Sequence, residues 1–297
     1  MSELQLGPWH ALPAGGGQAL AIDGATLAAA SPTHLVAWRD GREIASHAAA
    51  RRIAGWPRIA GERVLWGDGM LDLADGRWLP ARGAEALFEA TTPLGTEYAT
   101  AWAWSPDAQA LGCCIAGGRD AGARFVLLDT ASGAARTLWR STDLAPQAAW
   151  LGRSGIVLGS RQPQRWGRDG SPAAALGTGP ALPALRIESS AGETRLLIAD
   201  PLGLAVWALP EAERILDCRG HWIDATLTPD GQALFAVDAA GTLQGCTLQP
   251  GHAPRPLTGG PPGIAALACD ATQLLLGAGR RWHLAPWRLQ PAGGTRR

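Results

Sequence analysis

The sequence predicts an all-β fold, a seven-bladed β-propeller whose sheets close into a ring. Three observations lead to this prediction. A strand–turn–strand unit recurs along the chain, its central strands are apolar on both faces, and helical periodicity is weak in a chain with 39 Gly and 22 Pro among 297 residues.

The recurring unit is clearest around two Pro-Asp turns. Thr228-Pro229-Asp230-Gly231 joins one strand to the run 233–238, and Ser105-Pro106-Asp107 precedes the similar run 110–115. Pro fixes φ and Gly accepts positive φ, so these residues favour a tight reversal between two strands. Pro106 and Pro229 lie 123 residues apart, which corresponds to three repeats of about 41 residues.

We expect seven copies of the unit, each recognised by its second strand. The second strands are predicted at residues 34–38, 63–66, 110–115, 156–159, 194–200, 233–238 and 272–277.

The composition of these strands indicates how they pack. Leu196-Leu197-Ile198 and Leu274-Leu275-Leu276 are apolar at successive positions, so both faces of the strand must be buried. A propeller blade lies between two neighbours, whereas its outermost strand can be polar, as in residues 213–217. A β-sandwich or a two-domain β protein remains the alternative, although a sandwich would show a cleaner apolar and polar alternation.

Residues 1–297 are expected to form a single domain. The last repeat lacks an outer strand, which residues 6–12 can supply, and this pairing would close the ring and remove an open sheet edge. The segment 81–97 does not fit the repeat and carries Glu85, Phe88, Glu89 and Glu97. It is predicted to be an inserted loop with a short helical turn.

Charge and targeting signals narrow the class of protein. The 26 basic residues equal the 26 acidic ones, which argues against nucleic acid or an anionic membrane as the partner. The N-terminus lacks the basic start of a signal peptide, and the apolar runs are too short to span a bilayer, so we expect a cytoplasmic protein. Five Cys without metal or disulfide spacing predict buried, reduced thiols.

The Ser105-Pro106-Asp107 and Thr228-Pro229-Asp230-Gly231 turns, each leading into a buried strand, resemble those of WD-repeat and related propellers over nearly the whole chain. No blade ends in the Trp-Asp dipeptide, so the resemblance implies the fold and transfers no functional residue. It implies a scaffold that presents a face or the central funnel to a partner. Short bacterial propellers of this kind are also similar to the third component of systems pairing a MoxR-type ATPase with a von Willebrand A protein, which makes those proteins candidate partners.

Tryptophan is the dominant aromatic residue, with 14 copies against one Tyr and three Phe. Most are expected to fill gaps between blades, where the indole N–H finds a carbonyl. The members expected to do so are Trp104, Trp139, Trp150 and Trp207. Trp166 and Trp222 stand in polar surroundings and are the predicted surface anchors for a partner.

The densest basic cluster comprises Arg161, Arg165 and Arg168 around Trp166. Guanidinium groups there could hold an acidic peptide or a phosphate, and the alternative is an ordinary solvated hairpin on the fourth blade. The predicted partner-binding residues are therefore Arg161, Arg165, Trp166, Arg168 and Trp222.

Catalytic and metal motifs are not recognisable in the sequence. The six His residues show no metal spacing, although a propeller channel can collect ligands from separate blades. We therefore predict a non-catalytic protein-interaction scaffold that presents a face or a loop to a protein partner, without cofactor or metal. The alternative is an enzyme or small-ligand binder in which acids or histidines from several blades meet at the central funnel.

Overall fold

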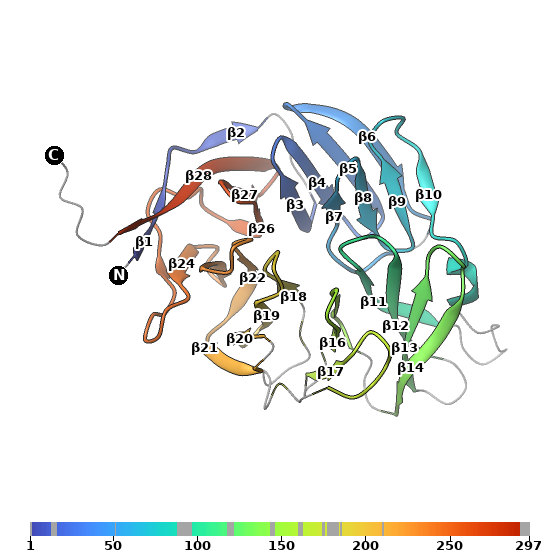
Figure 1. Ribbon diagram of the computed structural model, residues 1–297. Helices are drawn as coiled ribbons and strands as arrows, with labels where there is room; N and C mark the ends of the chain where they lie inside the picture. Colours follow the sequence, from blue (N-terminus) through green and yellow to red (C-terminus); the bar gives the residue numbers. More distant parts are fainter. Residues whose placement is uncertain are drawn as a thin grey trace.

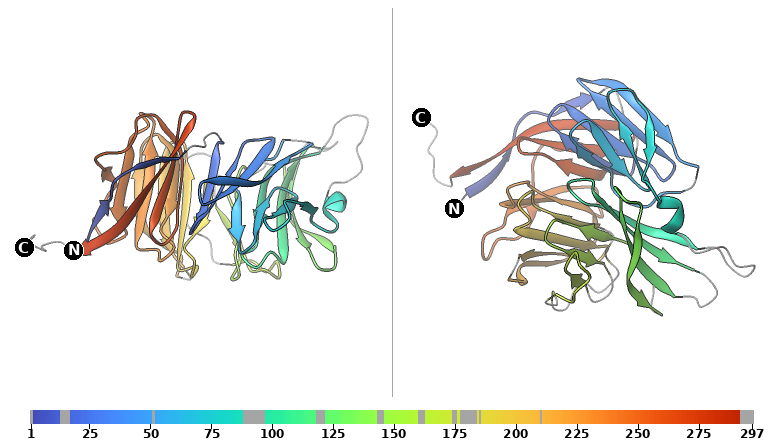
Figure 2. Two further views of the ribbon diagram at one scale, coloured as in Figure 1. Left: turned by 90° about the horizontal axis from the view of Figure 1, so that it is seen from above. Right: turned by 45° about the vertical axis from the view of Figure 1, so that its right-hand side comes forward.

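Seven small antiparallel sheets surround a central axis in the computed structural model (Figure 1). The structure describes residues 2–12, 17–50, 52–87, 97–117, 122–142, 146–159, 163–173, 176, 184, 186–209 and 211–291. Seen from above, the strands of successive blades stand across the thickness of the ring (Figure 2). The predicted all-β, seven-bladed propeller is confirmed.

Each blade is a meander in which successive strands pair. The first strands are β3 (Ala19–Asp23), β7 (Arg58–Ala60), β11 (Tyr98–Trp104), β15 (Ala149–Leu151), β18 (Arg186–Ser189), β22 (Trp222–Leu227) and β26 (Ile264–Cys269). The second strands are β4 (Thr26–Ala30), β8 (Arg63–Trp66), β12 (Ala110–Ala116), β16 (Ile156–Leu158), β19 (Arg195–Asp200), β23 (Ala233–Asp238) and β27 (Gln273–Ala278).

The third and fourth strands lie farther from the axis. The third strands are β5 (His34–Arg39), β9 (Gly69–Asp72), β13 (Ala123–Asp129), β17 (Gln164–Trp166), β20 (Gly203–Ala208), β24 (Leu243–Thr247) and β28 (Arg281–Pro291). The fourth strands are β6 (Arg42–Ala48), β10 (Trp78–Pro80), β14 (Ala135–Ser141), β21 (Glu213–Arg219) and β25 (Arg255–Pro256). The predicted polar outer strand at residues 213–217 is part of β21, which is mostly exposed or half-buried.

Alternate side chains of the second strands pack against opposite neighbours. In β27, Leu275 packs with Leu20 of the first blade, whereas Leu274 and Leu276 pack with Phe235 of the sixth. Because successive side chains of a strand point to opposite faces, an unbroken apolar run serves two interfaces at once. The predicted burial of these strands on both faces is confirmed.

The Pro-Asp turns share one hydrogen-bond network. Thr228 Oγ1 donates to Asp230 Oδ1 over 2.6 Å and accepts from the Ala233 amide over 3.0 Å. Ser105 Oγ does the same with Asp107 Oδ1 (2.6 Å) and the Ala110 amide (2.9 Å). In both repeats a buried hydroxyl satisfies the first amide of the second strand, which explains why Ser or Thr precedes the Pro.

One predicted second strand was assigned to the wrong position. Residues 34–38 lie in β5, the third strand of the first blade, and the second strand is β4. All five residues of β4, Thr-Leu-Ala-Ala-Ala, are buried. Three Ala give this segment little strand propensity, and its burial comes from close packing between blades, which a search for Val, Ile and Leu runs misses.

The N-terminal segment closes the ring, as predicted, but in two pieces. β2 (His10–Leu12) pairs with Trp282–Leu284 as the outer strand of the last blade, and β1 (Ser2–Leu6) pairs with Trp287–Pro291 at the far end of β28 (Figure 1). The expected segment 6–12 is therefore interrupted, because Gly7 and Pro8 separate the two strands. Leu4 and Leu6 of β1 pack against the apolar cluster of the sixth blade.

The segment predicted as an insertion contains a short 3-10 helix, Ala84–Leu87. Residues 88–96, including Phe88 and Glu89, lie outside the described residues. Both flanks of that stretch are held by Arg124 of β13, whose Nη2 donates to the Leu87 carbonyl (2.9 Å) and to Glu97 Oε2 (2.7 Å). No helix in the described part of the chain has the length and hydropathy needed to cross a membrane.

Some of the tryptophan indoles pack between blades with the indole N–H bonded to a backbone carbonyl. Trp104 Nε1 donates to the Gly67 carbonyl (3.0 Å) and Trp207 Nε1 to the Leu176 carbonyl (2.8 Å), which confirms the predicted role for both. Trp150 differs, because its Nε1 donates to the Ser189 hydroxyl (3.0 Å). Trp139 of β14 is half-buried against a core cluster.

The clasp gives a first testable prediction. Leu4→Asp places a charge in the half-buried contact with the sixth blade, so we expect the free energy of unfolding to fall by about 1–2 kcal/mol. Gln5→Asp, on the exposed face of the same strand, should change stability by no more than about 0.5 kcal/mol. Thermal and urea unfolding measure both, and equal losses would show that β1 is not packed as described.

The turn network gives a second prediction. Thr228→Val keeps the side-chain shape but leaves the Ala233 amide without its acceptor. We therefore expect the free energy of unfolding, measured with urea, to fall by about 1–3 kcal/mol. Thr137→Val, at an exposed position of β14, is the matched control and should stay within about 0.5 kcal/mol. A neutral Thr228→Val would contradict a structural role for the hydroxyl.

Candidate functional site

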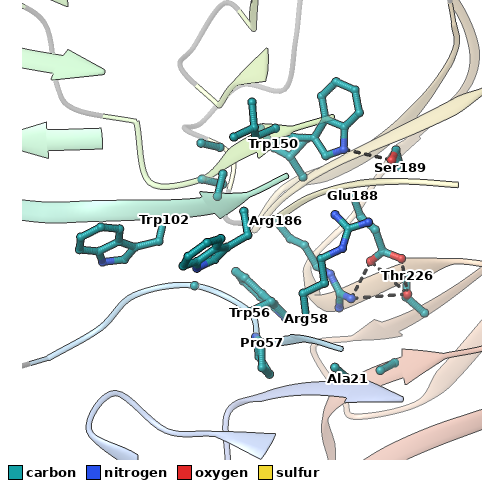
Figure 3. Close-up of a pocket in the computed structure, with 18 of the residues that line it drawn as sticks. Ala21, Trp56, Pro57, Arg58, Trp102, Trp150, Arg186, Glu188, Ser189 and Thr226 are labelled. Carbon is teal, nitrogen blue, oxygen red and sulfur yellow. Dashed lines mark hydrogen bonds and ion pairs between the residues drawn. The ribbon is translucent and has the colours of Figure 1, made fainter. Parts of the chain in front are cut away.

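A cavity of about 310 Å³ lies where the first strands of the seven blades converge. Residues from every blade line it, among them Ala21, Arg58, Trp102, Trp150, Glu188, Thr226 and Cys269. Its volume is at the lower end of the range for ligand sites, and such sites are commonly apolar with a few polar groups. This funnel is the candidate functional site (Figure 3).

One buried arginine organises the polar side of the funnel. Arg186 Nη1 lies 2.7 Å from Asp224 Oδ1, and its Nη2 lies 2.6 Å from Glu188 Oε2. Burial alone would lower the pKa of Arg186, but the carboxylates of Asp224 and Glu188 raise it above its ordinary value, so the guanidinium stays charged.

Backbone groups form further hydrogen bonds with this ion pair. Arg186 Nη1 donates to the Leu267 carbonyl (3.1 Å), and the Leu267 amide donates to Asp224 Oδ2 (2.9 Å). The Ala225 amide donates to Asp224 Oδ1 (2.9 Å). The ion pair therefore joins the fifth, sixth and seventh blades beside the cavity.

Glu188 is half-buried and already has its own partners. Thr226 Oγ1 donates to Glu188 Oε1 over 2.8 Å, and Arg186 holds the other carboxylate oxygen. We call Arg186, Glu188, Asp224 and Thr226 the Arg186 cluster. Next to it, the Cys269 thiol donates to the Leu227 carbonyl (2.9 Å), and burial raises its pKa well above the ordinary value, so the sulfur is a thiol and a poor nucleophile.

Four tryptophans, Trp56, Trp102, Trp104 and Trp150, form the apolar side of the funnel. Trp102 and Trp56 lie on one side of the view and Glu188, Ser189 and Thr226 on the other (Figure 3). Trp150 is fixed by its bond to Ser189, and the Arg186 guanidinium lies over the Trp56 ring at 5.3 Å from its centroid. One aromatic face is thus already covered by a cation.

Arg58 is the second arginine of the funnel, and it lacks a partner within the described residues. It enters at the first residue of β7 and is half-buried. No described group forms a hydrogen bond with Arg58, and no described carboxylate oxygen lies within 4.0 Å of its guanidinium nitrogens. Burial lowers the pKa of Arg58 below its ordinary value, while the nearby carboxylate of Glu188 raises it in part.

The funnel offers few groups for acid–base or metal chemistry. Of the described residues that line it, Glu188 is the one carboxylate, and none is a histidine. Nowhere in the described part of the chain do three or more His, Cys, Asp or Glu side chains lie together so that they could hold a metal ion. The described cysteines are free thiols, as expected, with Cys113, Cys114 and Cys246 buried and Cys218 and Cys269 half-buried.

The predicted basic cluster lies on the fourth blade, away from the funnel lining. Arg165 and Trp166 are in β17, Arg168 follows in the next turn, and Arg161 lies outside the described residues. Arg168 Nη1 is 3.7 Å from Asp107 Oδ2, and Arg168 lines a second hollow of about 310 Å³ with Arg136 and Leu127. Arg165, Trp166 and Arg168 lie near one another because they are close in the sequence.

The two predicted tryptophan anchors lie on different blades. Trp166 and Trp222 are both half-buried, and each packs against the core of its own blade and a neighbour. Trp222 stands next to Ile223, and its amide donates to the Pro201 carbonyl (3.2 Å), beside Leu202. Leu202 and Ile223 are two of the few large apolar residues that are exposed in the described part of the chain.

Sequence reasoning missed Arg58, Arg186 and Glu188. Arg186 and Glu188 alternate with Ile187, which places both charges on one face of a first strand. Trp56-Pro57-Arg58 concentrates an aromatic and a cation immediately before another first strand. Charges on the strand nearest the axis are the signal that could have identified them, but it requires knowing which strand that is.

The ion pair of the Arg186 cluster gives a third prediction. Asp224→Asn removes the buried partner of Arg186, and we expect a loss of about 3–5 kcal/mol in urea unfolding. Asp217→Asn breaks an exposed ion pair with Arg214 and should cost less than about 1 kcal/mol. Similar losses for both variants would contradict the central role of the Asp224 carboxylate.

Comparison with known proteins adds no family to this description. No protein-family model matches the sequence, and no curated protein does either. The seven-bladed fold is therefore established by the strand pairing, and function has to be inferred from the residues of the funnel.

Proposed function

We propose that this chain is a non-catalytic protein-interaction module whose central funnel receives part of a protein partner. The observation that carries the proposal is the lining of the funnel, where the described residues include four tryptophans and two arginines in a cavity to which all seven blades contribute. Trp and Arg are the side chains most often found at the energetic centre of protein interfaces.

The chemistry of the funnel favours recognition over catalysis. General acid–base catalysis uses titratable groups that reach the substrate, whereas Glu188, the one carboxylate among the described lining residues, is already bonded to Thr226 and Arg186. The Cys269 thiol is protonated. An enzyme in which acids or histidines converge is the alternative, and the described lining offers it little support.

The rigidity of the ring also supports binding. Through its bonds to the backbone of Leu267, the Arg186 cluster joins three blades beside the cavity, so the funnel is formed before a partner arrives. A preformed site loses less conformational entropy on binding. The resemblance to WD-repeat propellers supports the same role, because such propellers act as scaffolds, and we propose that this one acts in a cytoplasmic assembly. A MoxR-type ATPase or a von Willebrand A protein is the proposed partner.

The fourth prediction tests which surface is used. The tagged protein and three variants are each used to recover partners from the native cell, and recovery is measured by quantitative mass spectrometry. The variants are Arg58→Ala in the funnel, Arg168→Ala at the fourth blade and Ile223→Ser beside Trp222. These positions avoid truncating Trp166 and Trp222, which pack against the core.

We expect the same partners to bind the unmodified protein, Arg168→Ala and Ile223→Ser, and recovery with Arg58→Ala to fall about tenfold. Arg58 has no bond to the described residues, so its loss should leave the melting temperature unchanged. Recovery that falls with Arg168→Ala or Ile223→Ser and not with Arg58→Ala would move the interface to the predicted outer residues and contradict the proposal.

A further inference from the structure

We infer that the group recognised in the funnel is a carboxylate of the partner protein, bound by Arg58, with an adjacent apolar side chain against Trp102 and Trp150. This inference depends on the proposed function, because it names the chemistry that the funnel selects. It follows from which charged groups in and beside the funnel already have hydrogen-bond or ion-pair partners within the described residues and which do not.

Glu188 of the funnel lining and Asp224 beside it have their partners within the protein. Both oxygens of Asp224 accept hydrogen bonds, from Arg186, Ala225 and Leu267. Both oxygens of Glu188 are engaged by Thr226 and Arg186. Every carboxylate oxygen of the Arg186 cluster therefore already accepts a hydrogen bond or pairs with Arg186, although its two carboxylates outnumber its one guanidinium.

Arg58 is the charged lining residue that forms no hydrogen bond or ion pair with the described residues, although the nearby Glu188 carboxylate attracts it at longer range. Its guanidinium carries several N–H donors into the cavity, yet it makes no hydrogen bond or ion pair with the described residues. A half-buried cation is partly desolvated, which strengthens its attraction for an incoming anion. The fork geometry of guanidinium suits the two oxygens of a carboxylate.

The tryptophans do not make the site selective for a cation. Aromatic cages bind ammonium groups through the ring faces, but the Trp56 face is occupied by Arg186, and a second cation would lie close to both arginines. Trp102 and Trp150 remain as apolar walls for the residue that accompanies the carboxylate. The volume of about 310 Å³ allows about one or two side chains of a peptide to enter.

The fifth prediction uses capped peptides that differ in one side chain. The probes are acetyl-Phe-Glu-Ala-amide, its neutral Gln form, its cationic Lys form, and acetyl-Ala-Phe with a free C-terminal carboxylate. Affinity is measured by isothermal titration calorimetry, at low and high salt, with the full chain and with Arg58→Gln and Arg168→Gln. Comparing the Glu peptide with the peptide that ends in a free carboxylate shows whether the funnel binds an acidic side chain or a C-terminus.

We expect a carboxylate peptide to bind at least tenfold tighter than the Gln form, with a preference that weakens as salt rises. Arg58→Gln should abolish this preference, whereas Arg168→Gln, the matched control on the fourth blade, should keep it. Because the preference is a ratio within one variant, it does not depend on small differences in stability.

Equal binding of the Glu and Gln peptides, or tighter binding of the Lys peptide, would overturn the carboxylate inference while leaving the funnel as the partner site. A Glu preference that survives Arg58→Gln would also overturn it. The proposed function fails separately, if no peptide binds and recovery of native partners is unaffected by Arg58→Ala.

Discussion

Every blade of this protein depends on its neighbours, because the second strand of a blade is apolar on both faces. Leu196 and Ile198 pack toward the fourth blade, and Leu197 between them packs toward the sixth. A single sheet could bury at most one of these faces, so an isolated blade would expose a row of leucines to water. Stacking around a closed ring hides both faces of every sheet, and the clasp of the N-terminal strands onto β28 provides the final contact.

The same constraint creates the funnel. When the second strands pack side by side, the first strands are brought close to the axis, and their inward side chains must fill the space or line a cavity. Most are small or apolar, such as Ala21 and Ala149, but Arg58, Arg186 and Glu188 are charged. The Arg186 cluster bonds its charged groups to one another and to the backbone of Leu267, and so joins three blades, whereas Arg58 makes no hydrogen bond or ion pair with the described residues. This contrast separates a structural ion pair from a candidate recognition group.

How much of this could be predicted from the sequence depends on the range of the interaction. The Pro-Asp turns and the unbroken Leu runs are local signals, and they predicted the ring and six of its second strands correctly. β4 was missed because its Ala residues are defined by the blade packed against them and have little strand propensity of their own. The register of the clasp was also approximate, since Gly7 interrupts a pairing that extends to Ser2.

The funnel could not be predicted in this way. Arg58 and Glu188 are 130 positions apart, and the pairs Arg186–Asp224 and Asp224–Leu267 each join different blades. Local density of Arg instead drew attention to residues 161–168, where the charged residues are neighbours in the sequence and Arg168 contacts Asp107 of the third blade. Sites built at the axis of a repeat protein require knowledge of which strand lies innermost and which residues of it face inward.

The most direct test of this account is hydrogen–deuterium exchange followed by mass spectrometry across the whole chain. If blades cannot bury their faces alone, amides of the second strands β4, β8, β12, β16, β19, β23 and β27 should exchange slowest and at one common rate, set by opening of the entire ring. Outer strands such as β21 should exchange faster. Independent exchange of one blade, with the others still protected, would contradict the mutual dependence from which the funnel and its free arginine follow.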